Sequence, residues 1–261
     1  MKCDKLFCML AVCAALSFPS AAWAEAFVAP TLSNLVKTMI RFGALDINDD
    51  EVIDVYGQIV ECGTFRDYYQ DEFKWQKVRN IIRESIRSNV EVFPTGIRYE
   101  TTLRLDRYDF DEKYYPIGGR NANVSANSFR LRTTDKDYCT LKSADRIPEN
   151  YRFVLDKAVQ IRGLPLSEEE GRTLFNRMEK IKNYTHLIFV RFNLSVRFIA
   201  PVAMIEETEA NLKGPKDKVA MRGILATQSI KGDAITVDTH LDSIEYYEDE
   251  ARTRLIYVYR P

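Results

Sequence analysis

The feature that most constrains the fold is a long alternating segment over residues 186–199. Its even-numbered positions from 188 onward are all apolar, and most of its odd-numbered positions are polar or charged. The apolar set is Ile188, Val190, Phe192, Leu194, Val196 and Phe198. Successive side chains of a β-strand point to opposite faces, so the pattern predicts a long strand with one buried face. No catalytic motif lies on this segment. It therefore predicts a structural scaffold and does not indicate a reaction or a ligand.

Helix and strand patterns in the second half of the chain predict an α+β fold. A helix is predicted over residues 167–182, where Ser167 and Glu170 have the spacing of a capping box. Further strands are predicted at 97–105, 129–133, 151–155, 219–230, 234–247 and 253–259. The connections between most of them are short, which favours antiparallel pairing. We predict N-terminal helices followed by a mainly antiparallel sheet or sandwich with one packed helix.

The first half of the mature chain has helical periodicity. Apolar residues at intervals of three and four predict helices over 31–42 and over a segment that Gly63 closes. A longer helix is predicted over 65–88, and Pro94 and Gly96 mark its exit. We therefore divide the mature chain into a helical N-terminal portion, residues 25–94, and an antiparallel sheet domain, residues 95–261.

Residues 1–24 have the composition of a secretory signal peptide. Lys2 and Lys5 precede an apolar run over residues 6–18, and Ala22 and Ala24 supply the small residues of a cleavage site. The run is shorter than a membrane span requires. We expect cleavage after Ala24 and export to the periplasm, or to another compartment outside the cytoplasm.

The formal net charge of the exported chain limits the classes of partner that it can attract. The segment removed carries two lysines and one aspartate, so cleavage changes the formal net charge from −1 to −2. A chain this close to neutrality has no global field that would attract nucleic acid.

Of the five cysteines only Cys62 and Cys139 remain, and we expect an even pair in an oxidising compartment to form a disulfide bond. The alternative is two reduced cysteines that are buried separately.

Acidic and aromatic residues recur together in two parts of the chain. They are Asp49-Asp50-Glu51, Asp54-Val55-Tyr56, Glu61-Cys62, Tyr68-Tyr69 and Glu72-Phe73-Lys74-Trp75, then Arg107-Tyr108-Asp109-Phe110-Asp111 and Tyr115-Pro116. This pattern resembles an uncharacterised family of exported bacterial proteins that is known only as a domain of unknown function. The resemblance extends over most of the mature chain. It implies that helices and sheet form one unit, and it transfers no activity, substrate or catalytic residue.

The acidic segment after the first predicted strand is the candidate for catalysis. It contains Asp106, Asp109, Asp111 and Glu112. Paired carboxylates can perform acid-base chemistry on glycans if their environments separate their pKa values. However, Arg104, Arg107 and Lys113 alternate with these acids, and that arrangement favours ordinary ion pairs. A hydrolase of envelope glycans that uses these carboxylates is therefore the alternative hypothesis.

Other chemistries have little support in the sequence. Asp46, Asn48 and Asp50 alternate as calcium ligands do, but the glycine and the glutamate that the loop requires are absent, and helix capping explains the acids better. The two histidines, His186 and His240, lack the spacing of metal sites. No nucleophile motif of a serine hydrolase occurs. We expect no metal site and no cofactor.

Three arginines at intervals of four residues are the candidate for partner binding. Arg79, Arg83 and Arg87 form one ridge on the predicted helix 65–88, opposite Phe73, Ile82 and Ile86. We expect the ridge to face outward and to meet an anionic envelope component or an acidic protein surface, although a solvated helix face is the simpler interpretation. The leading hypothesis is a binding or scaffolding protein of the envelope that is not an enzyme.

Overall fold

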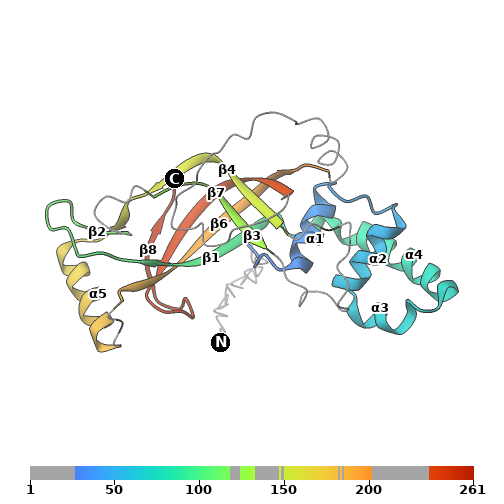
Figure 1. The fold of residues 1–261 in the computed structure, drawn as a ribbon, viewed down its shortest axis with the longest axis horizontal. Coiled ribbons are helices and arrows are strands. Elements are labelled where there is room, and N and C mark those ends of the chain that lie inside the picture. The colour runs from blue at the N-terminus through green and yellow to red at the C-terminus, as the bar shows by residue number, and fades with distance from the viewer. Residues whose placement is uncertain are drawn as a thin grey trace, which may run out of the picture.

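The computed structural model describes residues 27–117, 124–132, 147, 150–181, 183, 185–201 and 235–261. Its helices are α1 (Leu32–Arg41), α2 (Asp50–Ile59), α3 (Cys62–Tyr68), α4 (Glu72–Asn89), the short 3-10 helix η1 (Val90–Val92) and α5 (Glu168–Lys180). Its strands are β1 (Gly96–Arg104), β2 (Tyr114–Pro116), β3 (Val124–Arg132), β4 (Asn150–Ile161), β5 (Gly163–Pro165), β6 (Leu187–Ile199), β7 (Ile235–Tyr247) and β8 (Leu255–Tyr259). Helices come first and a mostly antiparallel sheet follows, which confirms the α+β class (Figure 1). The predicted strand 219–230 and Cys139 lie outside the described residues.

The long alternating segment is the centre of the sheet, as its pattern predicts. The strand order is β1-β6-β7-β4-β3, and β8 also pairs with β7. Strand β6 pairs antiparallel with β1 and with β7. Strand β7 is long enough to pair with β4 through its first half and with β8 through its second half. The β4–β7 pairing is parallel and departs from the antiparallel pattern of its neighbours.

The sheet curls so that its two outer strands approach each other. Tyr99 on β1 and Phe129 on β3 stand at opposite ends of the strand order, yet their ring centroids are 5.1 Å apart. Phe192 of β6 lies 4.8 Å from Phe129. The even-numbered residues of β6 from Ile188 to Val196 therefore point into the curl and are buried. Phe198, which the alternation also placed on this face, is exposed and Ile199 is buried, because the register shifts between Val196 and Phe198.

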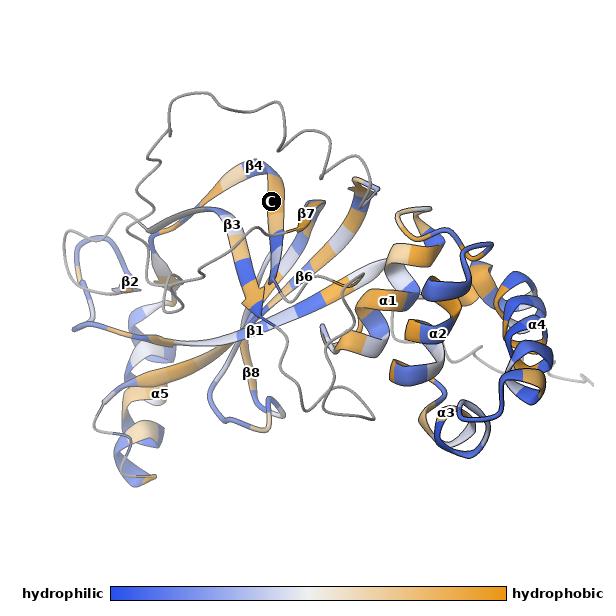
Figure 2. Ribbon diagram, turned by 45° about the vertical axis from the view of Figure 1, so that its right-hand side comes forward, coloured by the Kyte–Doolittle hydropathy of each residue, from blue (hydrophilic) through white to orange (hydrophobic). Residues whose placement is uncertain are grey.

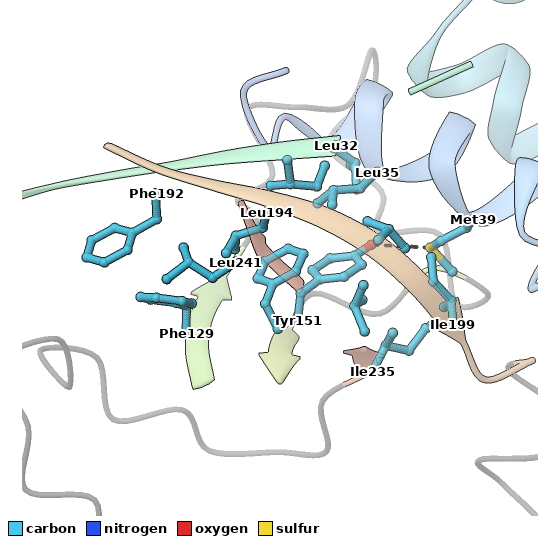
Figure 3. Packing of buried hydrophobic residues seen from close by; sticks show 14 of the residues in the cluster. Leu32, Leu35, Met39, Phe129, Tyr151, Phe192, Leu194, Ile199, Ile235 and Leu241 are labelled. Carbon is cyan, nitrogen blue, oxygen red and sulfur yellow. Dashed lines mark hydrogen bonds between the residues drawn. The ribbon is translucent and has the colours of Figure 1, made fainter. Parts of the chain in front are cut away.

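Helix α1 packs at the end of this core, as Figure 3 shows. Leu32, Leu35 and Met39 point from α1 toward the side chains of the curled sheet. The hydroxyl of Tyr151 on β4 lies 4.0 Å from the sulfur of Met39. The first helix and the sheet consequently bury one continuous hydrophobic core.

The predicted helix 65–88 is wrong as a single element. The chain forms α3 and α4 instead, because Asp71 begins a new helix: its carboxylate accepts a hydrogen bond from the backbone N–H of Lys74 at 3.1 Å. Helix α4 buries only Trp75, Ile82 and Ile86, and most of it is hydrophilic in Figure 2. Phe73, which we placed with Ile82 and Ile86 on the side of the helix opposite the arginines, is 86% exposed and does not share their burial.

A second, small sheet connects the large sheet to α5. Residues 114–128, where the sequence pattern predicts no strand, contain β2, which pairs antiparallel with β5, and the beginning of β3. The capping box of α5 is confirmed, since Ser167 and Glu170 each accept a hydrogen bond from the backbone N–H of the other. Helix α5 lies beyond the end of the sheet and does not cross its face (Figure 1). In the described part of the chain, no helix has the length and apolar character needed to span a membrane.

Candidate functional site

A feature that could hold a ligand is an aromatic pocket between the β1–β2 connection and α5. Its volume is about 570 Å³. Its lining consists of Arg107, Tyr108, Phe110, Tyr115, Glu168, Arg172, Phe175 and His186. The elements that form it lie at the opposite end of the molecule from α2, α3 and α4 (Figure 1). We call this feature the aromatic pocket.

Two tyrosines form the wall of the aromatic pocket next to α5. The hydroxyl of Tyr108 donates a hydrogen bond to the carbonyl oxygen of Leu166, and that of Tyr115 donates to the carbonyl oxygen of Gly171, both at 2.8 Å. Gly171 permits this approach, because a Cβ at that position would lie 2.9 Å from the ring of Tyr108. Burial raises the pKa of both phenols, so they remain hydrogen-bond donors at neutral pH.

The opening of the aromatic pocket is surrounded by rings that are partly exposed. Phe110 is 68% exposed, and its ring meets that of Tyr108 edge to face at 5.1 Å. Phe175 on α5 meets His186 in the same manner at 5.8 Å. His186 has a φ of 50°, and its position just before β6 brings its ring close to α5. Rings exposed to this degree leave apolar area for a ligand to cover.

The charged residues of the aromatic pocket come from two different segments. Glu168 and Arg172 lie one turn apart on α5 and form an ion pair at 2.9 Å, with both side chains largely exposed. Arg107, on the β1–β2 connection, is exposed and forms no ion pair with the residues that the structure describes. Because Glu168 compensates Arg172, the charge of Arg107 remains uncompensated at the opening.

The candidate acids lie on the other side of the same segment. A polar hollow of about 400 Å³ is lined by Arg107, Tyr108, Asp109, Phe110, Asp111, Tyr114 and Pro116. It contains two of the four predicted acids, while Asp106 and Glu112 lie outside its lining. One carboxylate oxygen of Asp109 accepts hydrogen bonds from the backbone N–H groups of Asp111 and Glu112, each at 3.0 Å. Asp109 therefore holds the turn that presents Phe110.

Arg79 and Arg83 do not face outward, so our expectation is wrong for these two residues, whereas Arg87 is exposed. Arg79 forms a bidentate pair with Asp54, through its Nε and Nη2 atoms, both at 2.6 Å. Arg83 pairs with Asp50 and donates to the carbonyl oxygen of Ile47 at 3.0 Å. Arg87 donates to the side-chain oxygen of Asn48. The ridge therefore joins α4 to α2 and to the loop before it, which gives these arginines a structural role.

The acids that resemble calcium ligands take part in local hydrogen bonds. Asp46 accepts from the backbone N–H of Asn48 at 2.9 Å, whereas Asp50 pairs with Arg79 and Arg83. Their neighbour Asp49 caps α2 by accepting from the backbone N–H of Glu51 at 2.9 Å. The contacts of Asp46 and Asp49 are the helix-capping and turn geometry that the sequence favours. Within the described ranges, no group of three or more acidic, histidine or cysteine side chains is placed to hold a metal ion.

The outer face of the sheet aligns a serine, a histidine and an aspartate from three strands. Ser195 of β6 stands opposite His240 of β7, and His240 Nδ1 lies 2.9 Å from the carboxylate of Asp156 on β4. The hydrogen bond from His240 lowers the pKa of Asp156. However, the Ser195 hydroxyl donates to Asp242 at 2.6 Å and not to the histidine. The proton transfer that a serine nucleophile requires is therefore not prepared here.

Part of the amino-acid sequence matches the model of a known protein family. Residues 49–177 match a family described as "Domain of unknown function (DUF4852)". This segment belongs to that family. The DUF4852 segment begins at the cap of α2 and extends through most of α5, so it contains every residue that lines the aromatic pocket except His186. Searches of curated proteins and of solved structures gave no match.

Proposed function

We propose that the protein is an exported, envelope-associated binding protein, and that the aromatic pocket is its binding site. The observation that supports this proposal is the gathering of Tyr108, Phe110, Tyr115, Phe175 and His186 around one cavity of about 570 Å³. Such a volume is within the range of roughly 300–1,000 Å³ that is typical of ligand pockets. An apolar pocket with charged residues only at its opening is suited to binding and lacks the buried polar groups that most catalytic centres use.

Replacing Phe110 with serine should weaken the binding of an apolar probe about tenfold, because the probe loses part of the apolar area that it covers. Phe110 is mostly exposed, so the change should leave the free energy of unfolding nearly unaltered. The probe is N-phenyl-1-naphthylamine, a neutral dye whose fluorescence rises in apolar surroundings. Its dissociation constant is measured by titration of the mature protein.

Phe73→Ser is the matched control for this experiment. Phe73 is also an exposed phenylalanine, but it lies on α4 at the other end of the molecule. We expect this variant to bind the dye as the wild type does. Equal weakening in both variants would show that the dye binds exposed rings in general, and it would contradict the proposal.

Export and the disulfide bond belong to the same proposal. Cys62 is the first residue of α3, whereas Cys139 lies outside the described residues, so their pairing stays a prediction. In protein recovered from the periplasm we expect an N-terminus at Glu25 and no cysteine that reacts with an alkylating reagent before reduction. Mass spectrometry measures both. Two alkylated cysteines in the unreduced protein would contradict the disulfide bond.

Hydrolysis of envelope glycans is the second candidate function. The observation in its favour is that Asp109 and Asp111 line the same polar hollow. Against it, Asp109 is held by two backbone N–H groups of its own turn. Release of soluble fragments from purified peptidoglycan by the wild type, with loss of that release in Asp111→Asn, would support the hydrolase and contradict a purely binding role.

A further inference from the structure

We propose that the ligand of the aromatic pocket is a single-chain amphiphile with an anionic head group. Its apolar chain lies in the pocket, and its head group lies at the opening between Arg107 and Arg172. This inference rests on the proposed function and adds the chemical class of the ligand. Three properties of the pocket support it: its apolar interior, the presence of two arginines in its lining and the exposure of the ion pair between Glu168 and Arg172.

The interior of the aromatic pocket offers few polar groups to a ligand. Tyr108 and Tyr115 are the hydroxyl-bearing residues of the lining, and each donates its proton to a backbone carbonyl oxygen at 2.8 Å. No hydroxyl proton of the lining is therefore available for a sugar or another polyol. The rings of Phe110 and Phe175 add apolar area near the opening. The part of the ligand that enters the pocket is consequently a hydrocarbon or an aromatic group.

The two arginines reach the pocket from separate segments. Arg107 belongs to the β1–β2 connection and Arg172 to α5, and both side chains line the pocket. Guanidinium groups stay charged at any physiological pH, and their forked N–H donors match carboxylate and phosphate oxygens. Arg107 has no ion-pair partner among the described residues, so its charge is available to a head group.

Arg172 can turn from its present partner toward a ligand. Its ion pair with Glu168 is exposed, with 72% of the arginine side chain and 58% of the glutamate side chain accessible. Exposed pairs of this kind contribute little, about 0.2–1 kcal/mol. An anionic head group would therefore compete with Glu168 for the guanidinium. Removal of the Glu168 charge should strengthen the binding of an anionic ligand, whereas removal of either arginine charge should weaken it.

The anion could come from a free amphiphile or from the surface of a bilayer. The pocket favours the free molecule, because its lining comes from the β1–β2 connection, β2 and α5, which together leave a cavity of about 570 Å³ for a single chain. A bilayer surface would instead meet the protein through exposed groups outside the pocket. We assign the free, single-chain molecule.

The test compares four probes that share a ten-carbon chain: decyl phosphate, decanoate, decanol and decyltrimethylammonium. Each displaces N-phenyl-1-naphthylamine from the mature protein at concentrations below micelle formation. We expect the two anions to bind more tightly than decanol and the cation to bind most weakly. Arg107→Gln and Arg172→Gln should each weaken decyl phosphate about two- to fivefold. Neither arginine variant should change the affinity for decanol. Glu168→Gln should strengthen the binding of decyl phosphate by a similar factor.

The possible results separate this inference from the proposed function. If all four probes bind equally and Phe110→Ser weakens the binding of each, the pocket binds apolar groups in general. The proposal of an anionic head group is then wrong. If neither the dye nor any probe binds, both the inference and the proposed function are wrong. If the protein is retained on phosphatidylglycerol vesicles but does not bind free decyl phosphate, a membrane surface replaces the amphiphile. The inference is supported if Arg107→Gln weakens and Glu168→Gln strengthens the binding of decyl phosphate, and if the other probes do not show these opposite changes.

Discussion

Replacing Gly163 with alanine is expected to lower the free energy of unfolding by about 2–3 kcal/mol. A Cβ at this position would lie 2.3 Å from the carbonyl oxygen of Tyr115 and 2.3 Å from the ring of Tyr114. The carbonyl belongs to the backbone of β2, so it cannot turn away as a flexible side chain could. The contact should push β2 and β5 apart and displace Tyr115, which is part of the aromatic pocket.

Gly63→Ala is the control for this prediction. A Cβ on Gly63 would meet no atom within 4 Å, and the residue lies in α3. This variant should be neutral or slightly more stable, because alanine favours the helix. Chemical denaturation gives both unfolding energies, and titration with N-phenyl-1-naphthylamine reports the pocket. A Gly163→Ala protein with wild-type stability and dye affinity would show that β2 does not support the pocket.

The sequence predicts most of the regular structure because each signal is local. The alternation of residues 188–196 is sufficient to define the buried face of β6, and Ser167 with Glu170 defines the start of α5. The curl of the sheet and the parallel β4–β7 pair could not be derived in this way. They depend on which strands meet in space, and the pattern of a single strand carries no information about its neighbours.

The aromatic pocket was not predicted, although its first segment was singled out for its acids. Its rings come from residues 108–115, from α5 and from the residue before β6, which are separate in the sequence. Each segment that carries one of these rings has the ordinary composition of a loop or of a helix face. The acids of the same segment attracted the catalytic hypothesis, but Asp109 shapes the turn that places Phe110 at the pocket.

The arginine ridge shows a different limit of reasoning from sequence. Helical spacing correctly places Arg79, Arg83 and Arg87 on one side of a helix. It cannot say whether that side meets solvent or another element. Here α2 and its preceding loop present Asp54, Asp50 and Asn48 to the three arginines in turn. Each acid or amide was visible in the sequence, but its pairing depends on how α2 packs against α4.

The second large effect is expected at Asp54, which is the centre of the contact between α2 and α4. Its carboxylate accepts hydrogen bonds from Trp75 Nε1 at 2.7 Å and from Arg79 Nε and Nη2 at 2.6 Å. The side chains of Asp54 and Arg79 are about one-fifth exposed, and Trp75 is buried. The hydrogen bond to Asp54 is the main reason why the pKa of Arg79 is raised.

Asp54→Ala should therefore lower the free energy of unfolding by about 2–3 kcal/mol. Breaking a fully buried ion pair would cost more, roughly 3–5 kcal/mol, but partial exposure lets water solvate the arginine that remains. The indole N–H of Trp75 also loses its acceptor inside the core. Asp54→Asn keeps one acceptor oxygen and should show a smaller loss. Urea denaturation measures each variant.

Arg87→Ala tests whether the effect belongs to this cluster or to the whole ridge. Arg87 lies on the same side of α4, but its contact is an exposed hydrogen bond to Asn48. Its removal should change the stability little, because exposed polar contacts are readily replaced by water. If Asp54→Ala and Arg87→Ala had equal, small effects, the ridge would be a solvated helix face, and the union of α2 and α4 would depend on apolar packing alone. If only Asp54→Ala is strongly destabilising, the ridge is an internal clamp, and its arginines are already engaged within the fold.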